Sequence, residues 1–143
     1  MKVKCVFNTG NNLSENTLQA GYSKTTRFNL DIDKEYAVYG MSMWKGSLNY
    51  LLAEDPSTPS FYPAELFEVT DHLLPLIWFF NFEKYENYEG KESSTAVWGY
   101  KEMVLDPDHY IALLEGKLEA LSIFNKRKEK IDEWQELRSQ KST

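Results

Sequence analysis

The spacing of apolar residues changes once along this chain, at Asp106–Pro107, and this change limits what the chain can fold into. Before it, apolar and polar residues alternate in short runs such as Lys2–Phe7 and Phe28–Asp33, which is the period of half-buried strands. After it, apolar residues recur at helical spacing. Asp is a favoured N-cap and Pro suits the first helical turn, so we expect a helix to begin here.

The two patterns together predict an α+β fold, with a bent antiparallel sheet or small barrel of about seven strands followed by one long C-terminal helix. At 143 residues the chain fits a single domain, 1–143, made of a strand-rich body (1–105) and a helix (106–138). We expect Gly116 to be tolerated inside this helix. We also expect the helix to leave the body at Lys126–Lys130, where charges interrupt the apolar stripe. The other expected strands are Tyr36–Trp44, Leu48–Ala53, Glu65–Val69 and Ala96–Val104, the first two joined by a tight turn at Gly46.

The most apolar stretch is Leu73–Phe82, which reads LLPLIWFFNF. It is too short to cross a bilayer, because a membrane-spanning helix needs about 20 apolar residues. Bulky residues on both faces favour a central strand that is covered on both sides. We therefore expect this segment to lie in the core, with no membrane contact.

Charge and cysteine content limit which partners and which cellular compartment we expect. The net charge is −6, and residues 1–105 carry nine Lys and Arg against fourteen Asp and Glu. This distribution argues against nucleic acid as a partner and is compatible with a basic protein, although a modest negative charge also simply maintains solubility. Cys5 is the single cysteine, and the N-terminus lacks the apolar segment of a secretory signal, so we expect a cytoplasmic protein.

No residue pattern in the chain names a reaction. His72 and His109 are the two histidines, and neither has a close metal-ligand spacing. Nucleophile elbows, phosphate-binding loops and dinucleotide-binding fingerprints are not found in the sequence. We expect no catalytic residues, no metal and no cofactor, and therefore not an enzyme.

The segment Glu83–Glu92 suggests a protein-binding surface. Glutamates recur every three residues, with tyrosines between them. Tyrosine offers rigid contact area, and carboxylates attract Lys or Arg. The alternative is an ordinary solvated loop. The candidate protein-binding residues are Glu83, Tyr85, Glu86, Tyr88, Glu89 and Glu92, with Glu54 and Asp55 extending the acidic surface if they lie on the same side.

Three blocks of the sequence, Tyr36–Leu52, Phe61–Phe80 and Val97–Glu115, resemble small bacterial immunity proteins that protect toxin-delivering cells, including those of contact-dependent growth inhibition systems. The resemblance lies in core and helix-start residues and covers most of the chain. It implies a cytoplasmic protein that binds and neutralises one cognate toxin domain, often a basic nuclease, by stoichiometric inhibition. It assigns no binding residue, because such families vary most at the surface that contacts the toxin.

Two other functions are compatible with the sequence. One is a small enzyme whose site combines His72, His109 and nearby acids. The other is a structural or adaptor module that docks through the C-terminal helix, with Ile131, Trp134 and Leu137 as the contact residues.

Overall fold

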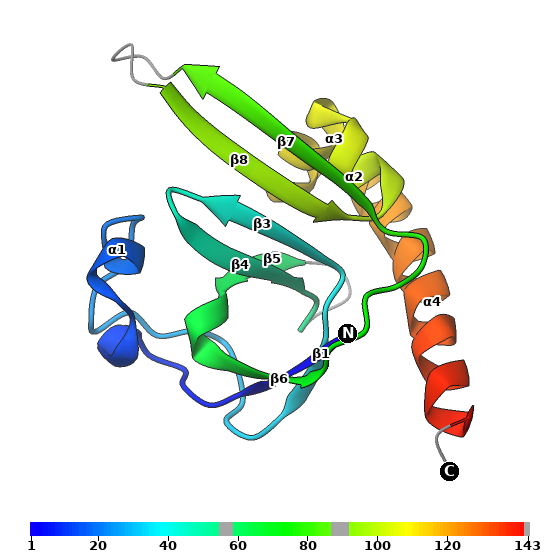
Figure 1. Ribbon diagram of the computed structural model, residues 1–143, viewed down its shortest axis with the longest axis horizontal. Coiled ribbons are helices and arrows are strands. Elements are labelled where there is room, and N and C mark those ends of the chain that lie inside the picture. Colours follow the sequence, from blue (N-terminus) through cyan, green and yellow to red (C-terminus); the bar gives the residue numbers. More distant parts are fainter. Residues whose placement is uncertain (55–58, 87–91, 142–143) are drawn as a thin grey trace.

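The computed structural model describes residues 1–54, 59–86 and 92–141, and only the backbone at 84–86, 92–94 and 141. The described residues form two antiparallel sheets and a set of helices at the C-terminal end, so the predicted α+β class is confirmed (Figure 1). Neither sheet closes into a barrel among these residues. The small sheet has the order β2 (Glu35–Ala37), β1 (Lys2–Cys5), β6 (Phe67–Asp71), and the large sheet has the order β5 (Ser60–Pro63), β4 (Ser47–Leu52), β3 (Gly40–Trp44), β8 (Glu92–Gly99), β7 (Phe79–Glu86). The helices are α1 (Glu15–Leu18), α2 (Lys101–Leu105), α3 (Pro107–Leu114) and α4 (Leu118–Lys141), with short 3-10 turns at Gly10–Asn12 and Ala64–Leu66.

The large sheet separates two apolar cores. On one face Tyr50 and Leu52 pack toward the small sheet, in a cluster that also contains Val3. On the other face Leu51 packs with Tyr100 and residues of the C-terminal helices. Successive residues of a strand point to opposite faces, so β4 contributes to both cores and is covered on both sides.

The predicted hairpin is confirmed as β3 and β4. The two strands pair antiparallel from Gly40 opposite Leu51 to Trp44 opposite Ser47. Lys45 and Gly46 both have positive φ, at 49° and 78°. Two consecutive positive φ angles characterise the tight turns that match the twist of a hairpin.

The prediction of a strand at Phe28–Asp33 is wrong. The Leu30 amide donates to the Phe28 carbonyl, and the Asp33 amide donates to the Cys5 carbonyl at 2.8 Å. Asp33 has a left-handed φ of 70°, which Asp tolerates better than most residues. Local turns and bonds to the region of β1 therefore take up the backbone hydrogen bonds that a strand would have used.

The single long helix predicted for 106–138 is interrupted. Asp106 caps α3 as expected, because its side chain accepts the amides of Asp108 and His109. However, Gly116 has a φ of 72° and ends this helix. The Gly116 amide donates to Leu113, and the Lys117 amide donates to Ala112. This is the hydrogen-bond pattern of a glycine-terminated helix. The chain also turns helical earlier than expected, since Lys101–Leu105 forms α2 and not the end of a strand.

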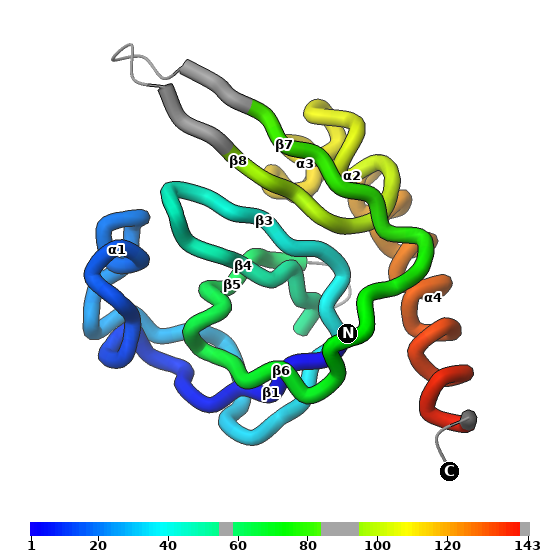
Figure 2. The backbone as a smooth tube through the Cα atoms, in the orientation of Figure 1, coloured from blue at the N-terminus to red at the C-terminus, as the bar shows by residue number. Residues whose placement is uncertain are grey.

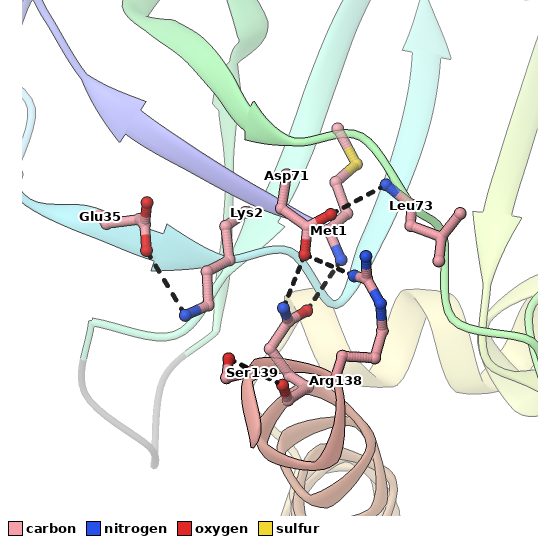
Figure 3. Close-up of polar contacts among 8 residues, drawn as sticks. Met1, Lys2, Glu35, Asp71, Leu73, Arg138 and Ser139 are labelled. Atoms are coloured by element: carbon pink, nitrogen blue, oxygen red, sulfur yellow. Dashed lines mark hydrogen bonds and ion pairs between the residues drawn. The ribbon is translucent and has the colours of Figure 1, made fainter. Parts of the chain in front are cut away.

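Helix α4 remains packed on the body along most of its length, so the prediction that it leaves at Lys126–Lys130 is wrong. Arg127 pairs with Glu102 in α2, with an Nε–Oε1 distance of 2.6 Å. Beyond it, Ile131 is buried, and Tyr39 donates from its hydroxyl to Asp132. The last contacts join the side chains of Gln135 and Arg138 to Asp71 at the end of β6. Figure 3 shows Arg138 and Asp71. Beyond Lys126, hydrogen bonds and ion pairs supplement the apolar contact of Ile131, and the apolar stripe of the sequence does not reveal such polar contacts.

Candidate protein-binding surface

The hairpin β7–β8 extends beyond the rest of the large sheet. β7 pairs with β8 over eight positions, from Phe79 opposite Gly99 to Glu86 opposite Glu92. β3 pairs with β8 only as far as Met43 opposite Ala96. Past this point the two strands continue as a ribbon with no third strand among the described residues, and it projects from the body in Figure 1. A two-stranded ribbon on its own is only marginally stable in water, so its free part is suited to gain stability from a partner.

Several candidate residues from the sequence lie on this projecting ribbon. Glu83 is exposed on β7. Tyr85 and Glu86 follow it on the same strand, and Glu92 begins β8. Tyr88, Glu89 and Asp55 lie outside the described residues. The register pairs Glu86 directly with Glu92, which sets two acidic residues across from each other.

Glu54 belongs to a different region. It follows β4. Across the large sheet, Leu51 of β4 lies in register with Gly40, Gly99 and Phe79, and Phe79 begins β7. The acidic ribbon lies at the opposite end of β7. Glu54 also pairs with Lys34 at 3.3 Å, and Lys34 lies 3.9 Å from Asp31. Glu54 is therefore apart from Glu83, and a cation of the chain already offsets its charge.

The segment Leu73–Phe82 is not a buried central strand, which overturns that prediction. Residues 72–78 form an irregular connection, traced in Figure 2 from β6 to β7, and only Phe79–Phe82 belong to a strand. That strand is the last one of its sheet. The segment contains seven exposed large apolar residues, which we call the apolar edge: Leu73, Leu74, Leu76, Ile77, Phe79, Phe80 and Phe82.

The pairing of β7 explains how its aromatic residues remain exposed. Phe80 is opposite Trp98, and the two ring centroids are 5.1 Å apart. Phe82 is opposite Ala96 on the same face. Phe80 and Phe82 still expose 56% and 53% of their surface, because they extend beyond the small sheet that covers β4. Exposed apolar patches of this kind mark interaction sites in soluble proteins.

The opposite face of the hairpin borders a groove against α3. A cavity of about 180 Å³ lies between the strands and the helix, with Asn81 and Glu83 from β7 and Tyr110 and Ile111 from α3 among its lining residues. A second cavity of about 350 Å³ continues past Trp44 and Tyr110, which line both. The side-chain amide of Asn81 donates to the Glu83 carboxylate at 3.1 Å. The groove thus combines aromatic walls with an exposed carboxylate at the base of the ribbon.

The two histidines have different environments. His109 is buried, with Nε2 at 2.7 Å from the Tyr100 hydroxyl. Burial lowers the pKa of His109, against the opposing effect of Glu102 and Asp106. His72 is exposed after β6. The part of the chain that the structure describes contains no group of three or more His, Cys, Asp or Glu residues placed to hold a metal ion.

The residues expected for an adaptor role are only partly available. Ile131 is 2% exposed and belongs to the core beneath α4. Trp134 lies under the Arg138 guanidinium, which is 4.9 Å from the ring centroid. Leu137 alone is an exposed large apolar residue. These three residues therefore do not form one free apolar face.

Comparison with known proteins gives no relative for this chain: no family, no curated protein and no solved structure matches it. Across residues 1–54, 59–86 and 92–141, no helix has both the length and the apolar character needed to cross a bilayer.

Proposed function

We propose that this protein is a cytoplasmic immunity protein that binds one cognate bacterial toxin domain and neutralises it by stoichiometric inhibition. The observation that carries the proposal is the β7–β8 ribbon, which projects past β3 and includes Glu83, Tyr85, Glu86 and Glu92 of the acidic, tyrosine-containing segment. The target we propose is a basic domain, such as a nuclease. An acidic projection would enter or cover the cationic surface that such a domain needs to bind its substrate.

Electrostatics supports this role in two ways. The chain carries a net charge of −6, which favours encounter with a cationic domain at low salt. The ribbon also pairs Glu86 with Glu92, and like charges directly across an antiparallel pair are destabilising. A Lys or Arg side chain from the toxin would offset that repulsion. Binding therefore would stabilise a part of the fold where no third strand of the described chain pairs.

The groove beside the ribbon adds a site for specificity. Glu83 lies at its edge, and Tyr110 and Ile111 line it. A toxin side chain with an apolar stem and a cationic end, such as Lys or Arg, suits this combination of surfaces. Charge would then determine the rate of encounter, and the groove would select the partner.

The test uses the full chain and the C-terminal domain of the protein encoded immediately upstream in its host genome. Calorimetry should give a one-to-one complex, and co-expression should restore growth of cells that produce the toxin domain. Glu83→Lys should weaken the complex by at least about tenfold, mainly through slower association. Glu68→Lys is the matched control, because Glu68 is an exposed glutamate on the small sheet. Absence of both complex and rescue would refute the proposal.

A further inference from the structure

The outer edge of β7 is open. β7 is the terminal strand of the large sheet, and no described strand pairs with its outer side. The Phe82 amide donates to the side-chain oxygen of its neighbour Asn81 at 2.9 Å. A backbone N–H in an antiparallel ladder points either toward the paired strand or away from it, so this bond indicates that the Phe82 amide points outward. By alternation, the Phe80 amide points outward as well.

Natural proteins usually protect such an edge with charges, prolines, bulges or a covering element. The strand begins with Phe79-Phe80-Asn81-Phe82, which carries no charge. Of the described residues, Asn81 covers one backbone amide of this edge with its side chain. An edge with this composition accepts another strand readily.

We propose that this edge pairs with the same edge of a second copy of the chain, so that the large sheet continues across a two-fold axis. The surface has the size that a dimer needs. The seven residues of the apolar edge are between 38% and 86% exposed, and together they present on the order of 600 Å² of surface. Each partner in a stable interface contributes about 800 Å², and the newly paired strand backbone supplies the remainder.

Charge also favours a second copy as the occupant. The chain carries a net charge of −6, so two copies repel each other over most of their surface. Leu73–Phe82 contains no charged residue, so contact there sets no acidic residue directly opposite another acidic residue. A basic partner would gain nothing from this neutral patch, whereas a neutral, self-complementary patch is what an isologous interface requires.

One register satisfies the geometry. A two-fold axis through Asn81, perpendicular to the sheet, places Phe80 of each copy opposite Phe82 of the other. The outward backbone amides of Phe80 and Phe82 in each copy then donate to backbone carbonyls of the other copy. The four phenylalanine rings meet on one face of the sheet. Cross-strand aromatic pairs of this type stabilise sheets. In this register Phe79 of each copy lies opposite Glu83 of the other, at the two ends of the paired segment. The inference goes beyond the proposed toxin binding and does not depend on it.

The first test is the oligomeric state of the full chain by sedimentation velocity, from about 1 µM to about 200 µM. We expect a monomer–dimer equilibrium. Amide hydrogen exchange over the same range should show slower exchange at Phe80 and Phe82 as the concentration rises. The Asn81 and Glu83 amides, which point toward β8 by the same alternation, serve as an internal control and should not change. A chain that is monomeric throughout, or a dimer with unchanged exchange at Phe80 and Phe82, would overturn the inference.

The second test is a charge exchange that depends on the register. The double variant Phe80→Lys/Phe82→Lys sets like charges opposite each other and should weaken dimerisation by at least about a hundredfold. Phe80→Lys/Phe82→Glu sets opposite charges across the axis and should restore most of the affinity. Leu137→Lys is the control, because it makes the same change at an exposed leucine on α4. If both double variants were equally monomeric, the register would be wrong. If a variant fails to fold, the exchange data on the unmodified chain still decide the question.

Discussion

Arg138 Nη1 lies 2.5 Å from Asp71 Oδ2, an ion pair that joins the last part of α4 to the end of β6 (Figure 3). Asp71 also accepts hydrogen bonds from the Gln135 amide at 2.7 Å and from the backbone amide of Leu73. Burial alone would raise the pKa of Asp71, but these bonds outweigh it and hold that pKa well below its ordinary value. One carboxylate therefore fixes the C-terminal helix to the small sheet.

Asp71→Asn should lower the free energy of unfolding at pH 7 by about 2 kcal/mol, because it removes hydrogen bonds to a charged group. A lowered folded-state pKa gives stability that is present above the ordinary carboxyl pKa and lost as the pH falls toward the folded value. In urea unfolding, the difference in free energy of unfolding between the unmodified protein and Asp71→Asn should accordingly become smaller between pH 5 and pH 3. The ordinary Asp pKa of about 4 sets this window. Glu68→Gln, in an exposed pair 3.9 Å from Lys4, should change stability by less than about 0.5 kcal/mol.

His109 should make the fold sensitive to mild acid. Its pKa is lowered by burial, so the unfolded chain takes up a proton at a higher pH than the folded chain does. Stability should therefore fall as the pH drops from about 7 through the ordinary histidine value of about 6.5. His109→Gln should remove this dependence, while costing about 1–3 kcal/mol because the Tyr100 hydroxyl loses its partner.

The comparison that separates His109 from the other histidine is thermal unfolding at several pH values. His72 has an exposed side chain, so the stability of His72→Gln should fall with decreasing pH as it does in the unmodified protein. A flat profile in the unmodified protein would contradict the role given to His109.

Gly116 should resist substitution. Its φ of 72° is strained for residues with a Cβ, although no atom lies within 4 Å of the place where a Cβ would be. Gly116→Ala should cost about 1–2 kcal/mol through the backbone alone. Gly116→Asn should cost less, since Asn adopts this conformation more readily. Equal losses for both variants in chemical denaturation would argue against a backbone cause.

Replacing both Tyr85 and Tyr88 with Ala should weaken the proposed toxin complex by several kcal/mol, because tyrosines at interface centres commonly contribute about 2 kcal/mol or more each. The matched Tyr→Phe pair keeps the rings and should retain most of the affinity. Surface plasmon resonance at increasing salt should show the loss of affinity mainly in the association rate. An unchanged affinity in the double Ala variant would exclude this segment from the interface.

Features fixed by neighbouring residues could be predicted from the sequence. Gly46 gives a turn because its backbone tolerates positive φ, and Asp106 caps a helix because its side chain reaches the next amides. Both depend on atoms a few residues apart. The same local chemistry also acts at two positions where the sequence pattern pointed to a longer element. Gly116 ends a helix, and Asp33 turns the chain where alternation suggested a strand.

The apolar edge shows where such reasoning stops. Leu73–Phe82 has bulky residues on both faces, so its sequence is equally compatible with a strand in the centre of a sheet and one at its edge. Only the strand order placed β7 last and left Phe80 and Phe82 exposed. In the same way, the charge of Glu83 was evident, but its position beside the groove under α3 depends on elements that come later in the chain.

The sequence by itself determined the α+β class, the β3–β4 hairpin, the start of α3 and an acidic segment near residue 83. The tertiary structure decided which strand is covered on both sides, that α4 stays docked through Asp71 and Glu102, and that the most apolar segment lies at an open edge. The physical reason is that turns and caps depend on bonds between near neighbours. Burial depends on what packs across from a residue, and no local pattern specifies that.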